Sequence, residues 1–326
     1  MTLRPLVVAA FLSIPAWPPA TPASDVVAPA AGVLASMRPP VAVERAGSNA
    51  APHVELGMRL EAGDVVKAGP GGGAIVYLAG GAIVHVKEGE RLAVPARGAA
   101  ARAVARDGAL PAGVVKASES GLWILNDPEG SIVVAGMRGG SDAAWGVTPD
   151  LRVVPLSPRY EVTLTARPRF VAAGGPRPAR ISVATGKQVV WTSGGLDGDG
   201  PWSPDGFPAL DPSKLYAWRL ESAADGAPVS EWVAFRVSPP AAADDAATFE
   251  RRMADLSGAP GGATAADVLR CGRYLETSSW TPLLSAAIRV LSIQPDSTLA
   301  KRARDRAIAG LRLEAADAAL LAGRLD

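Results

Sequence analysis

The chain has 326 residues, of which 48% are hydrophobic, and this length allows two or three domains. Its 33 basic and 32 acidic residues are balanced, which argues against a nucleic-acid partner because such proteins carry an excess of Lys and Arg. The single cysteine, Cys271, excludes an internal disulfide framework. Together with only two histidines it leaves too few ligands for a zinc site, so we expect neither a metal nor a cofactor.

Residues 1–23 have the pattern of a secretory signal peptide. Arg4 gives the positive start, the apolar stretch "PLVVAAFLSIPAW" follows, and "TPA" is a small-residue cleavage site. We therefore expect a periplasmic or secreted protein. No later segment is apolar for long enough to cross a bilayer, so we expect no membrane-spanning segment in the mature chain. Residues 24–40 are rich in Ala, Pro and Val, a composition that predicts an extended linker.

Residues 41–150 predict an all-β domain. Short β-type runs such as "VVKAG", "AIVYL", "AIVHV" and "RLAVP" are separated by glycines. In the second run, alternation places Ile75 and Tyr77 on one face and Val76 and Leu78 on the other. Since both faces are apolar, we expect this strand to be covered on both sides.

The glycine run at residues 69–73 could hold a phosphate or could form a turn. A phosphate loop needs a Lys and a Ser or Thr after its glycines, whereas Ala74 and Ile75 follow here. A dinucleotide-binding loop would open a helix, and the residues that follow are typical of a strand. We therefore predict a hairpin turn between "DVVKA" and "AIVYL", and a second tight turn at Gly80 and Gly81.

The succession "VELGMRLEAGDVVKAGPGGGAIVYLAGGAIVHVKEGERLAV" resembles the FecR-type periplasmic domain. It has a G-x-x-L-x-x-GD step, a strand, a glycine-rich turn, two paired strands and an "L-x-V" ending. It departs from the family at residues 79–81, Ala-Gly-Gly, where Asp-Gly-Ser is usual. The signalling members also carry a cytoplasmic helical segment and a membrane helix that this sequence lacks, so the resemblance does not imply transmembrane regulation of a sigma factor.

Residues 151–240 predict a second β domain, an antiparallel sandwich of the immunoglobulin type. Its strand-like segments include "YEVTLTARPRF", "ARISVATGKQVVW" and "KLYAWRL", with turn signals at residues 184–186 and 225–226. The pair "LYAWRL" and "WVAFRV", with Tyr216 and Trp218 on one face, resembles the last two strands of a fibronectin type III module.

Residues 241–326 predict an α-helical hairpin domain. One apolar stripe comprises Ala246, Phe249, Met253 and Leu256, and a second comprises Trp280, Leu283, Leu284, Ala287, Ile288 and Leu291. Thr264 and Asp267 predict a capping box ahead of core residue Cys271, and a last helix is expected to begin near Thr298. The order "YLETSSWTPLLSAAIRVLSIQPDS" resembles a tetratricopeptide-type helical hairpin.

Few residues have the spacing that catalysis or metal binding requires. His85 alternates with apolar residues on a predicted strand, and His53 lies in a predicted turn, so neither has an assigned role. Asp197 and Asp199 resemble the start of a calcium loop, but the closing glutamate is missing. Arg138 is expected to lie in solvent at the end of a strand rather than to bind an anion. Neither a nucleophile elbow nor a recognisable Ser–His–Asp arrangement occurs, so we predict no catalytic residues.

The eight tryptophans are the remaining candidates for an interaction surface. Core packing explains most of them, but an exposed tryptophan could stack on a sugar ring or anchor a partner. We expect Trp202, in a glycine-rich loop, to be exposed. Trp280 is expected to pack against Val268 and Leu275, or to anchor a partner if it is exposed.

These features predict an exported, non-enzymatic, FecR-like envelope protein that binds or scaffolds in the periplasm, with an envelope protein or glycan as its partner. One alternative is a ligand-sensing module of a periplasmic signalling system. A weaker alternative is an envelope enzyme acting on glycans, which would need a pair of carboxylates flanking an aromatic cleft. The sequence does not indicate the ligand or the oligomeric state.

Overall fold

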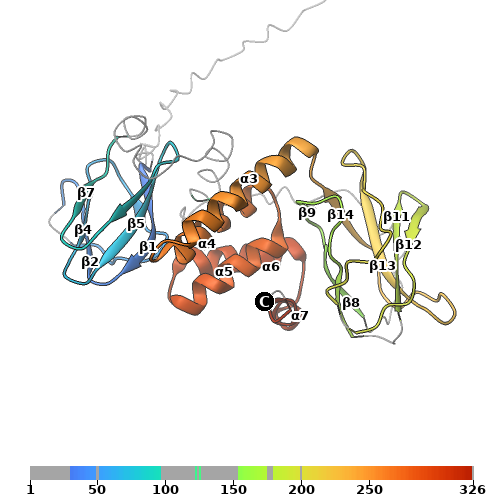
Figure 1. Ribbon diagram of the computed structural model, residues 1–326. Coiled ribbons are helices and arrows are strands. Elements are labelled where there is room, and N and C mark those ends of the chain that lie inside the picture. The colour runs from blue at the N-terminus through green and yellow to red at the C-terminus, as the bar shows by residue number, and fades with distance from the viewer. Residues whose placement is uncertain are drawn as a thin grey trace, which may run out of the picture.

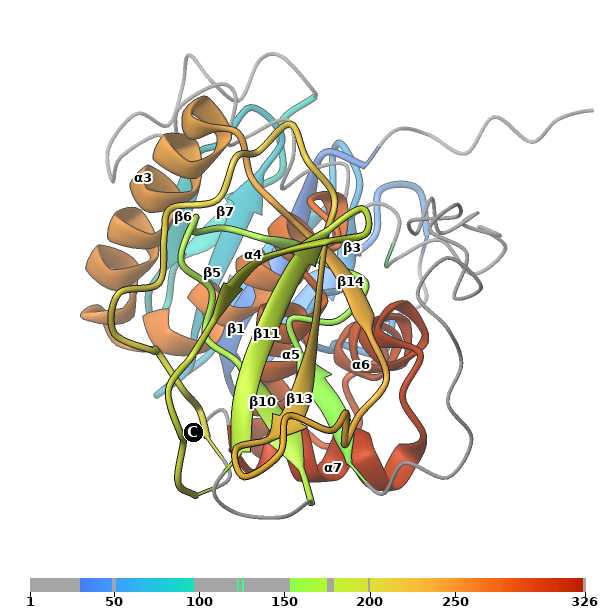
Figure 2. The ribbon, with the colours of Figure 1, turned by 90° about the vertical axis from the view of Figure 1, so that its right-hand side faces the viewer.

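The structure, a computed structural model, describes residues 30–48, 51–96, 122, 125, 153–174, 179–198 and 200–324. Mostly β-sheets form its N-terminal part, and a C-terminal region of five helices follows within the described residues. The helices come last in the sequence but lie between a first β region (residues 30–96) and a second β region (residues 153–237) (Figures 1 and 2). The predicted order of β and α classes is therefore confirmed. The predicted signal peptide lies outside the described residues.

The first β region consists of two sheets. Its strands are β1 (Gly32–Arg38), β2 (Val41–Glu44), β3 (Arg59–Leu60), β4 (Val65–Ala68), β5 (Gly73–Leu78), β6 (Ile83–Val86) and β7 (Arg91–Ala93). One sheet has the order β3-β1-β5-β6 and the other β2-β4-β7. Strand β5 confirms the predicted two-sided burial: Ile75 and Tyr77 belong to the core beneath the helices, and Val76 and Leu78 to the core of this β region.

The two glycine turns have different roles. Gly80 and Gly81, with φ of 102° and 90°, join the antiparallel strands β5 and β6, as predicted. The turn at residues 69–73 instead joins β4 to β5, which lie in different sheets, so the prediction of a hairpin there is wrong. The turn lies close against Pro40, where a Cβ on Gly72 would overlap the proline carbonyl oxygen. Glycine at position 72 is therefore required for close packing against Pro40.

The prediction of a linker at residues 24–40 is wrong for strand β1. This strand pairs with both β3 and β5, and its first five residues are buried. Apolar residues without hydrogen-bonding side chains fit an extended linker and a strand covered on both faces equally well. Composition alone could not separate the two, because the pairing strands lie more than twenty residues further along the chain.

The second β region has its own core. Its strands are β8 (Val154–Ser157), β9 (Val162–Thr163), β10 (Val171–Ala173), β11 (Ala179–Thr185), β12 (Gln188–Thr192), β13 (Tyr216–Ser222) and β14 (Val233–Val237). A five-stranded sheet has the order β12-β11-β13-β14-β9, and β10 pairs with β8. Gly186, with φ of 56°, lies in the predicted turn between β11 and β12. Tyr216 and Trp218 both lie in this core, as their alternation predicts.

The helical region comprises α3 (Pro240–Ser257), α4 (Gly262–Glu276), α5 (Trp280–Ile293), α6 (Thr298–Leu311) and α7 (Ala315–Ala322). The apolar stripe predicted for α3 is buried throughout, and Cys271 is buried in α4. The predicted capping box at Thr264 is wrong, because α4 already begins at Gly262, after Gly261 has turned the chain with φ of 74°. Helix α7 was not predicted: α6 ends at Leu311, and the chain turns at Arg312, which has a left-handed φ of 52° although it is neither glycine nor proline.

One apolar core joins the helices to both β regions. It includes Val33 and Ile75 of the first β region, Leu156 and Val171 of the second, and the buried faces of the helices. Helix α4 contacts β1, and α7 contacts β8 and β10. None of the helices in the described residues is both long and apolar enough to cross a membrane.

Candidate functional site

Trp202 is buried in the core of the second β region, so the prediction that it is exposed is wrong. Its side chain is 7% exposed, and its Nε1 donates a hydrogen bond to the carbonyl oxygen of Asp197 at 3.1 Å. Its backbone exchanges two hydrogen bonds with Phe170, and these draw the glycine-rich loop onto the sheet. A buried indole cannot stack on a sugar, so Trp202 is not part of an open surface.

Trp280 is also buried, at 2% exposure, and begins helix α5. It shares the central core with Val268 and Leu275, but its ring lies against Gly310 of α6, where a Cβ would overlap the indole. Its Nε1 donates to the carbonyl oxygen of Tyr160 at 3.0 Å. Trp280 therefore fixes the second β region to the helices, and its side chain is not open to a partner.

The other polar candidates are not brought together. His53 is exposed in a loop, and His85 is half-buried on β6. Asp197 is described, whereas Asp199 and Arg138 lie outside the described residues. In the part of the chain that the structure describes, no group of three or more His, Cys, Asp or Glu side chains could hold a metal ion.

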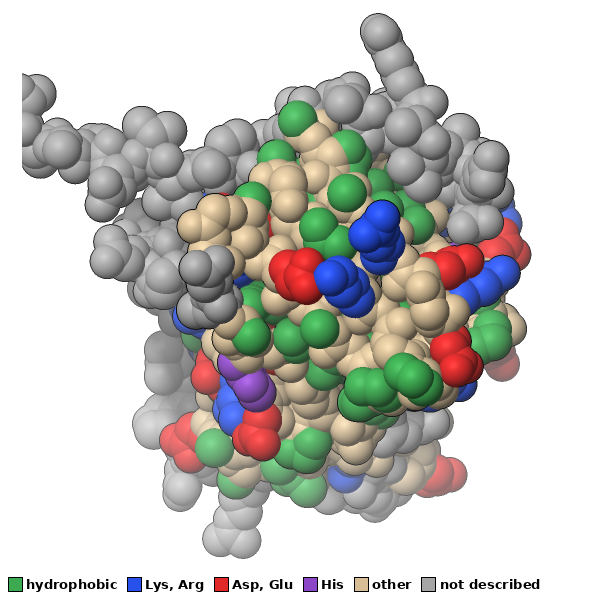
Figure 3. Space-filling view, turned by 90° about the vertical axis from the view of Figure 1, so that its left-hand side faces the viewer, with side chains coloured by type: hydrophobic (Ala, Val, Ile, Leu, Met, Phe, Trp, Pro, Cys, Tyr) green, Lys and Arg blue, Asp and Glu red, His purple; other side chains and the backbone are tan. Residues whose placement is uncertain are grey.

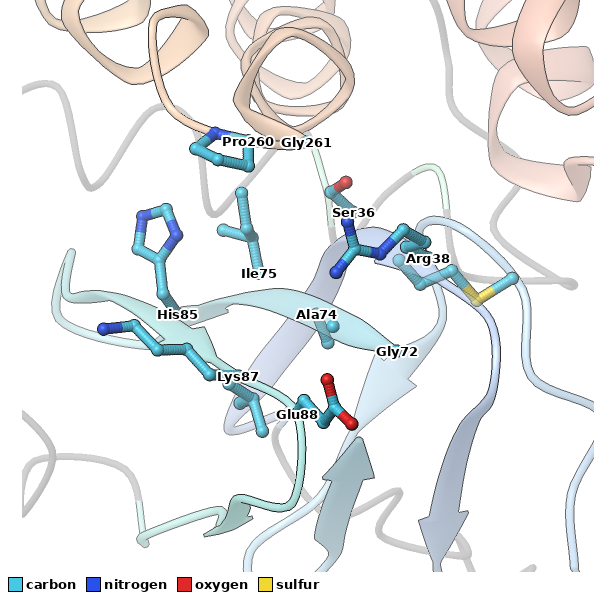
Figure 4. A pocket seen from close by; sticks show the side chains of 13 residues that line it. Ser36, Arg38, Gly72, Ala74, Ile75, His85, Lys87, Glu88, Pro260 and Gly261 are labelled. Atoms are coloured by element: carbon cyan, nitrogen blue, oxygen red, sulfur yellow. The ribbon is translucent and has the colours of Figure 1, made fainter. Parts of the chain in front are cut away.

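A large cavity lies between the first β region and the turn that joins α3 to α4 (Figure 4). Its volume is about 480 Å³. It is lined by Ser36, Met37, Arg38, Gly72, Gly73, Ala74, Ile75, His85, Val86, Lys87, Glu88, Pro260 and Gly261. We call this cavity the seam pocket, because its walls belong to two regions that are far apart in the sequence. Among the residues that the sequence analysis considered for binding chemistry, His85 and the glycines Gly72 and Gly73 line this pocket.

Strand register explains why these side chains meet. Ser36 of β1 pairs with Ile75 of β5, which pairs in turn with His85 of β6. Side chains two residues apart on a strand share a face, so Arg38 and Lys87 lie next to Ser36 and His85 on the side that faces the helices. A β-bulge between Leu34 and Ser36 precedes this row.

Gly73 makes room between the two cationic side chains. It pairs with Arg38 of β1, and Lys87 directly follows β6 on its other side. Because Gly73 has no side chain, the sheet is hollow between Arg38 and Lys87, and Figure 4 shows the two on opposite sides of Ala74. Neither side chain forms an ion pair or a hydrogen bond within the described residues, and both are exposed.

Ser36 is the buried polar group of the seam pocket. The residue is 4% exposed, and its hydroxyl has no hydrogen-bond partner among the described residues. A Cβ on Gly261 would lie 3.0 Å from the Ser36 Oγ, so glycine at this position leaves the hydroxyl free space. Figure 3 shows the end of the molecule formed by the first β region, where acidic, basic and apolar side chains are interspersed.

A second polar cluster fixes the second β region to α5. Glu161 is 2% exposed and accepts hydrogen bonds from the backbone N–H of Thr281 at 2.8 Å, the Thr281 hydroxyl at 2.7 Å and the Ser157 hydroxyl at 3.1 Å. Burial raises the pKa of this carboxyl, although its hydrogen bonds act in the opposite direction. Glu161 also lines a cavity of about 280 Å³. Because its lone pairs are used by Thr281 and Ser157, we interpret Glu161 as a structural cap of α5.

The sequence could not identify these two clusters. Ser36 lies in the segment predicted to be a linker, and Arg38 and Lys87 are 49 positions apart, so only the strand register brings them together. Comparisons with known proteins add no identification: no family model matches the chain, and no curated protein or solved structure matches it significantly.

Proposed function

We propose that this protein is an exported, non-enzymatic, FecR-like envelope protein that binds a ligand or partner in the periplasm through the seam pocket. The observation that supports this most directly is the pocket itself. Strands β1, β5 and β6 and the α3–α4 turn line one cavity of about 480 Å³, a size in the range of small-molecule sites. Within the part of the chain that the structure describes, its cationic and hydroxyl side chains have no hydrogen-bond or ion-pair partner.

The scaffolding part of the proposal is supported by the shared core. Helices contact both β regions, and polar contacts reinforce each boundary. On the first β region, the backbone N–H of Leu56 donates to Gln294 at 3.1 Å. On the second, Nε of Arg159 donates to the carbonyl oxygen of Leu311 at 2.8 Å. These contacts favour a scaffold in which the helices hold the two β regions in a fixed arrangement.

The ligand-sensing alternative is supported by where the seam pocket lies. A ligand bound between two regions contacts both, so binding stabilises the arrangement in which both walls are in place. The glycan-enzyme alternative has less support, because the seam pocket is lined by a single acidic residue, Glu88, and three other cavities by one each, Glu90, Glu161 and Asp205. A glycosidase mechanism needs two carboxylates at one site.

Site-specific photo-crosslinking in the native host tests the proposal. A photo-reactive amino acid at position 87 would face the seam pocket, and the same group at position 187, in the exposed β11–β12 turn, is the matched control. We expect a periplasmic protein cleaved near Ala23, and a covalent product from position 87 but not 187, detected by intact-mass spectrometry. Equal labelling at both positions would reject the binding site, and a cytoplasmic protein with Met1 intact would reject export.

A further inference from the structure

We propose that the seam pocket binds an oxyanion, a phosphate or carboxylate group, carried on a small apolar body. This inference deepens the proposed binding function and rests on it. Two exposed cations line the pocket, Arg38 from β1 and Lys87 after β6, and neither is neutralised by an ion pair in the described residues. Guanidinium and ammonium groups are the protein donors that best match phosphate and carboxylate oxygens.

The spacing of the strands that carry the two cations suits one shared anion. Strands β1 and β6 are separated only by β5, so their axes lie about 10 Å apart, twice the usual strand spacing. Long, exposed Arg and Lys side chains can each cover about half of that distance, and Gly73 presents no side chain between them. In Figure 4 the Lys87 side chain extends away from Arg38, but it is exposed, so a change of rotamer would let both cations contact an oxyanion over Gly73.

The Ser36 hydroxyl provides a third, more rigid donor. Ser36 is 96% buried, lies two residues from Arg38 on the same strand, and has no hydrogen-bond partner in the described residues. Because Ser36 lines the pocket, its hydroxyl is available to donate a hydrogen bond to a ligand oxygen there. This observation is independent of the two cations and points to the same part of the pocket.

Much of the remaining pocket wall is apolar. Met37, Ala74, Ile75, Val86 and Pro260 line it. A free inorganic anion would use none of these groups, whereas an alkyl or similar body would bury apolar area against them. Glu88 also lines the pocket and opposes an anion, but its single charge is outnumbered by Arg38 and Lys87.

The experiment measures binding to the purified mature protein by proton NMR. The chain has only two histidines, so the ring signals of His85 report on the pocket and those of the exposed His53 serve as an internal control. The probes are hexyl phosphate, hexanoate, inorganic phosphate and the neutral hexanamide. We expect hexyl phosphate or hexanoate, or both, to shift the His85 signals saturably and to leave those of His53 unchanged.

Charge-removing variants identify the groups that bind. Arg38→Gln and Lys87→Gln should each weaken binding by about three- to tenfold, the low end for charge-assisted contacts, because both cations are exposed to solvent. Ser36→Ala should also weaken it, and Glu88→Gln should tighten it. Lys187→Gln and Arg236→Gln, which remove exposed charges from the second β region, are the matched controls and should bind as the wild type. All the pocket variants change side chains without a partner in the described residues, so melting temperatures should stay unchanged.

Three results would overturn the proposal. Equal affinity for hexanamide would show that the charge is not recognised, wild-type binding by both Arg38→Gln and Lys87→Gln would show that these cations are not used, and parallel shifts of His53 would show non-specific association. Equal affinity for inorganic and hexyl phosphate would overturn the apolar body while supporting the oxyanion. If position 87 yields a specific crosslink but no oxyanion binds, the ligand class is wrong and the binding function stands.

Discussion

Replacing Trp280 by alanine should destabilise the protein strongly, because this residue joins three segments. Its indole lies against Gly310 of α6, it begins α5, and its Nε1 donates to the carbonyl oxygen of Tyr160 in the second β region. Truncation of a buried tryptophan to alanine typically costs about 3–5 kcal/mol. For a cooperative unit of this size, each kcal/mol lowers the melting temperature by about 2–4 °C. We therefore expect Trp280→Ala to lower the melting temperature by about 10 °C.

Two further variants separate the contributions to this effect. Trp280→Phe keeps most of the apolar ring but leaves the carbonyl oxygen of Tyr160 without its donor, which should cost about 1–3 kcal/mol. Trp232→Ala is the matched control, because that indole is half-buried and stacks with the Arg219 guanidinium at 4.5 Å from the ring centre. Its loss should cost about 1 kcal/mol or less. Urea titrations and thermal melts of the mature protein, followed by circular dichroism, provide the three values.

The outcome also tests how the regions depend on one another. Because the core of the helices includes residues of both β regions, we expect α5, α6 and the contacting part of the second β region to lose hydrogen-exchange protection together in Trp280→Ala. A melting temperature within a degree or two of the wild type would refute the core assignment of Trp280. If such a variant had also lost partner binding, the residue would be an exposed anchor instead.

Three other changes have defined outcomes. Burial raises the pKa of Glu161, so the folded protein holds this proton more tightly than the unfolded chain does. Urea midpoints measured from pH 4 to 8 should therefore show that the stability of the wild type, relative to Glu161→Gln, falls as the pH rises above the ordinary glutamate pKa of about 4. A difference in stability that stays constant with pH would contradict the raised pKa. The buried thiol of Cys271, whose pKa burial raises, should react with a thiol reagent only after unfolding. Gly72→Ala should destabilise through overlap with Pro40, whereas Gly194→Ala, which has no heavy atom within 4 Å of its Cβ, should not.

Local periodicity predicted the elements that depend on it. The alternation of Ile75 and Tyr77 with Val76 and Leu78 matches two separate cores, and the apolar stripe of α3 is buried. Such patterns are read from neighbouring residues, and burial of one face or two determines them directly. The prediction failed where composition had two meanings, as in β1, whose apolar residues suited a linker and a covered strand equally well.

Features that depend on pairing over long distances could not be predicted. The turn at residues 69–73 has the composition of a hairpin, but whether β4 and β5 pair is decided by β1 and β2, which occupy the neighbouring positions. Likewise, Ser36 meets His85 only through their common neighbour Ile75. The exposure expected for Trp202 failed for the same reason, because its backbone pairing with Phe170 is not visible in the local sequence.

Helix α4 links the seam pocket to the junction with the second β region, and this geometry gives the ligand-sensing alternative a specific test. Its N-cap, Gly261, lines the pocket, and the loop after its last turn holds Ser278, a left-handed residue with φ of 53° whose carbonyl oxygen accepts from Val162 at 3.1 Å. Left-handed conformations of non-glycine residues cost about 1–3 kcal/mol and persist only where surrounding contacts enforce them. The loop is therefore poised to report small changes in α4. If the protein senses a ligand, hexyl phosphate should change the hydrogen exchange of the Ser278 and Ser279 amides in the wild type but much less in Arg38→Gln. Unchanged exchange in a protein saturated with ligand would reject sensing through α4, because binding would then leave this junction unaffected.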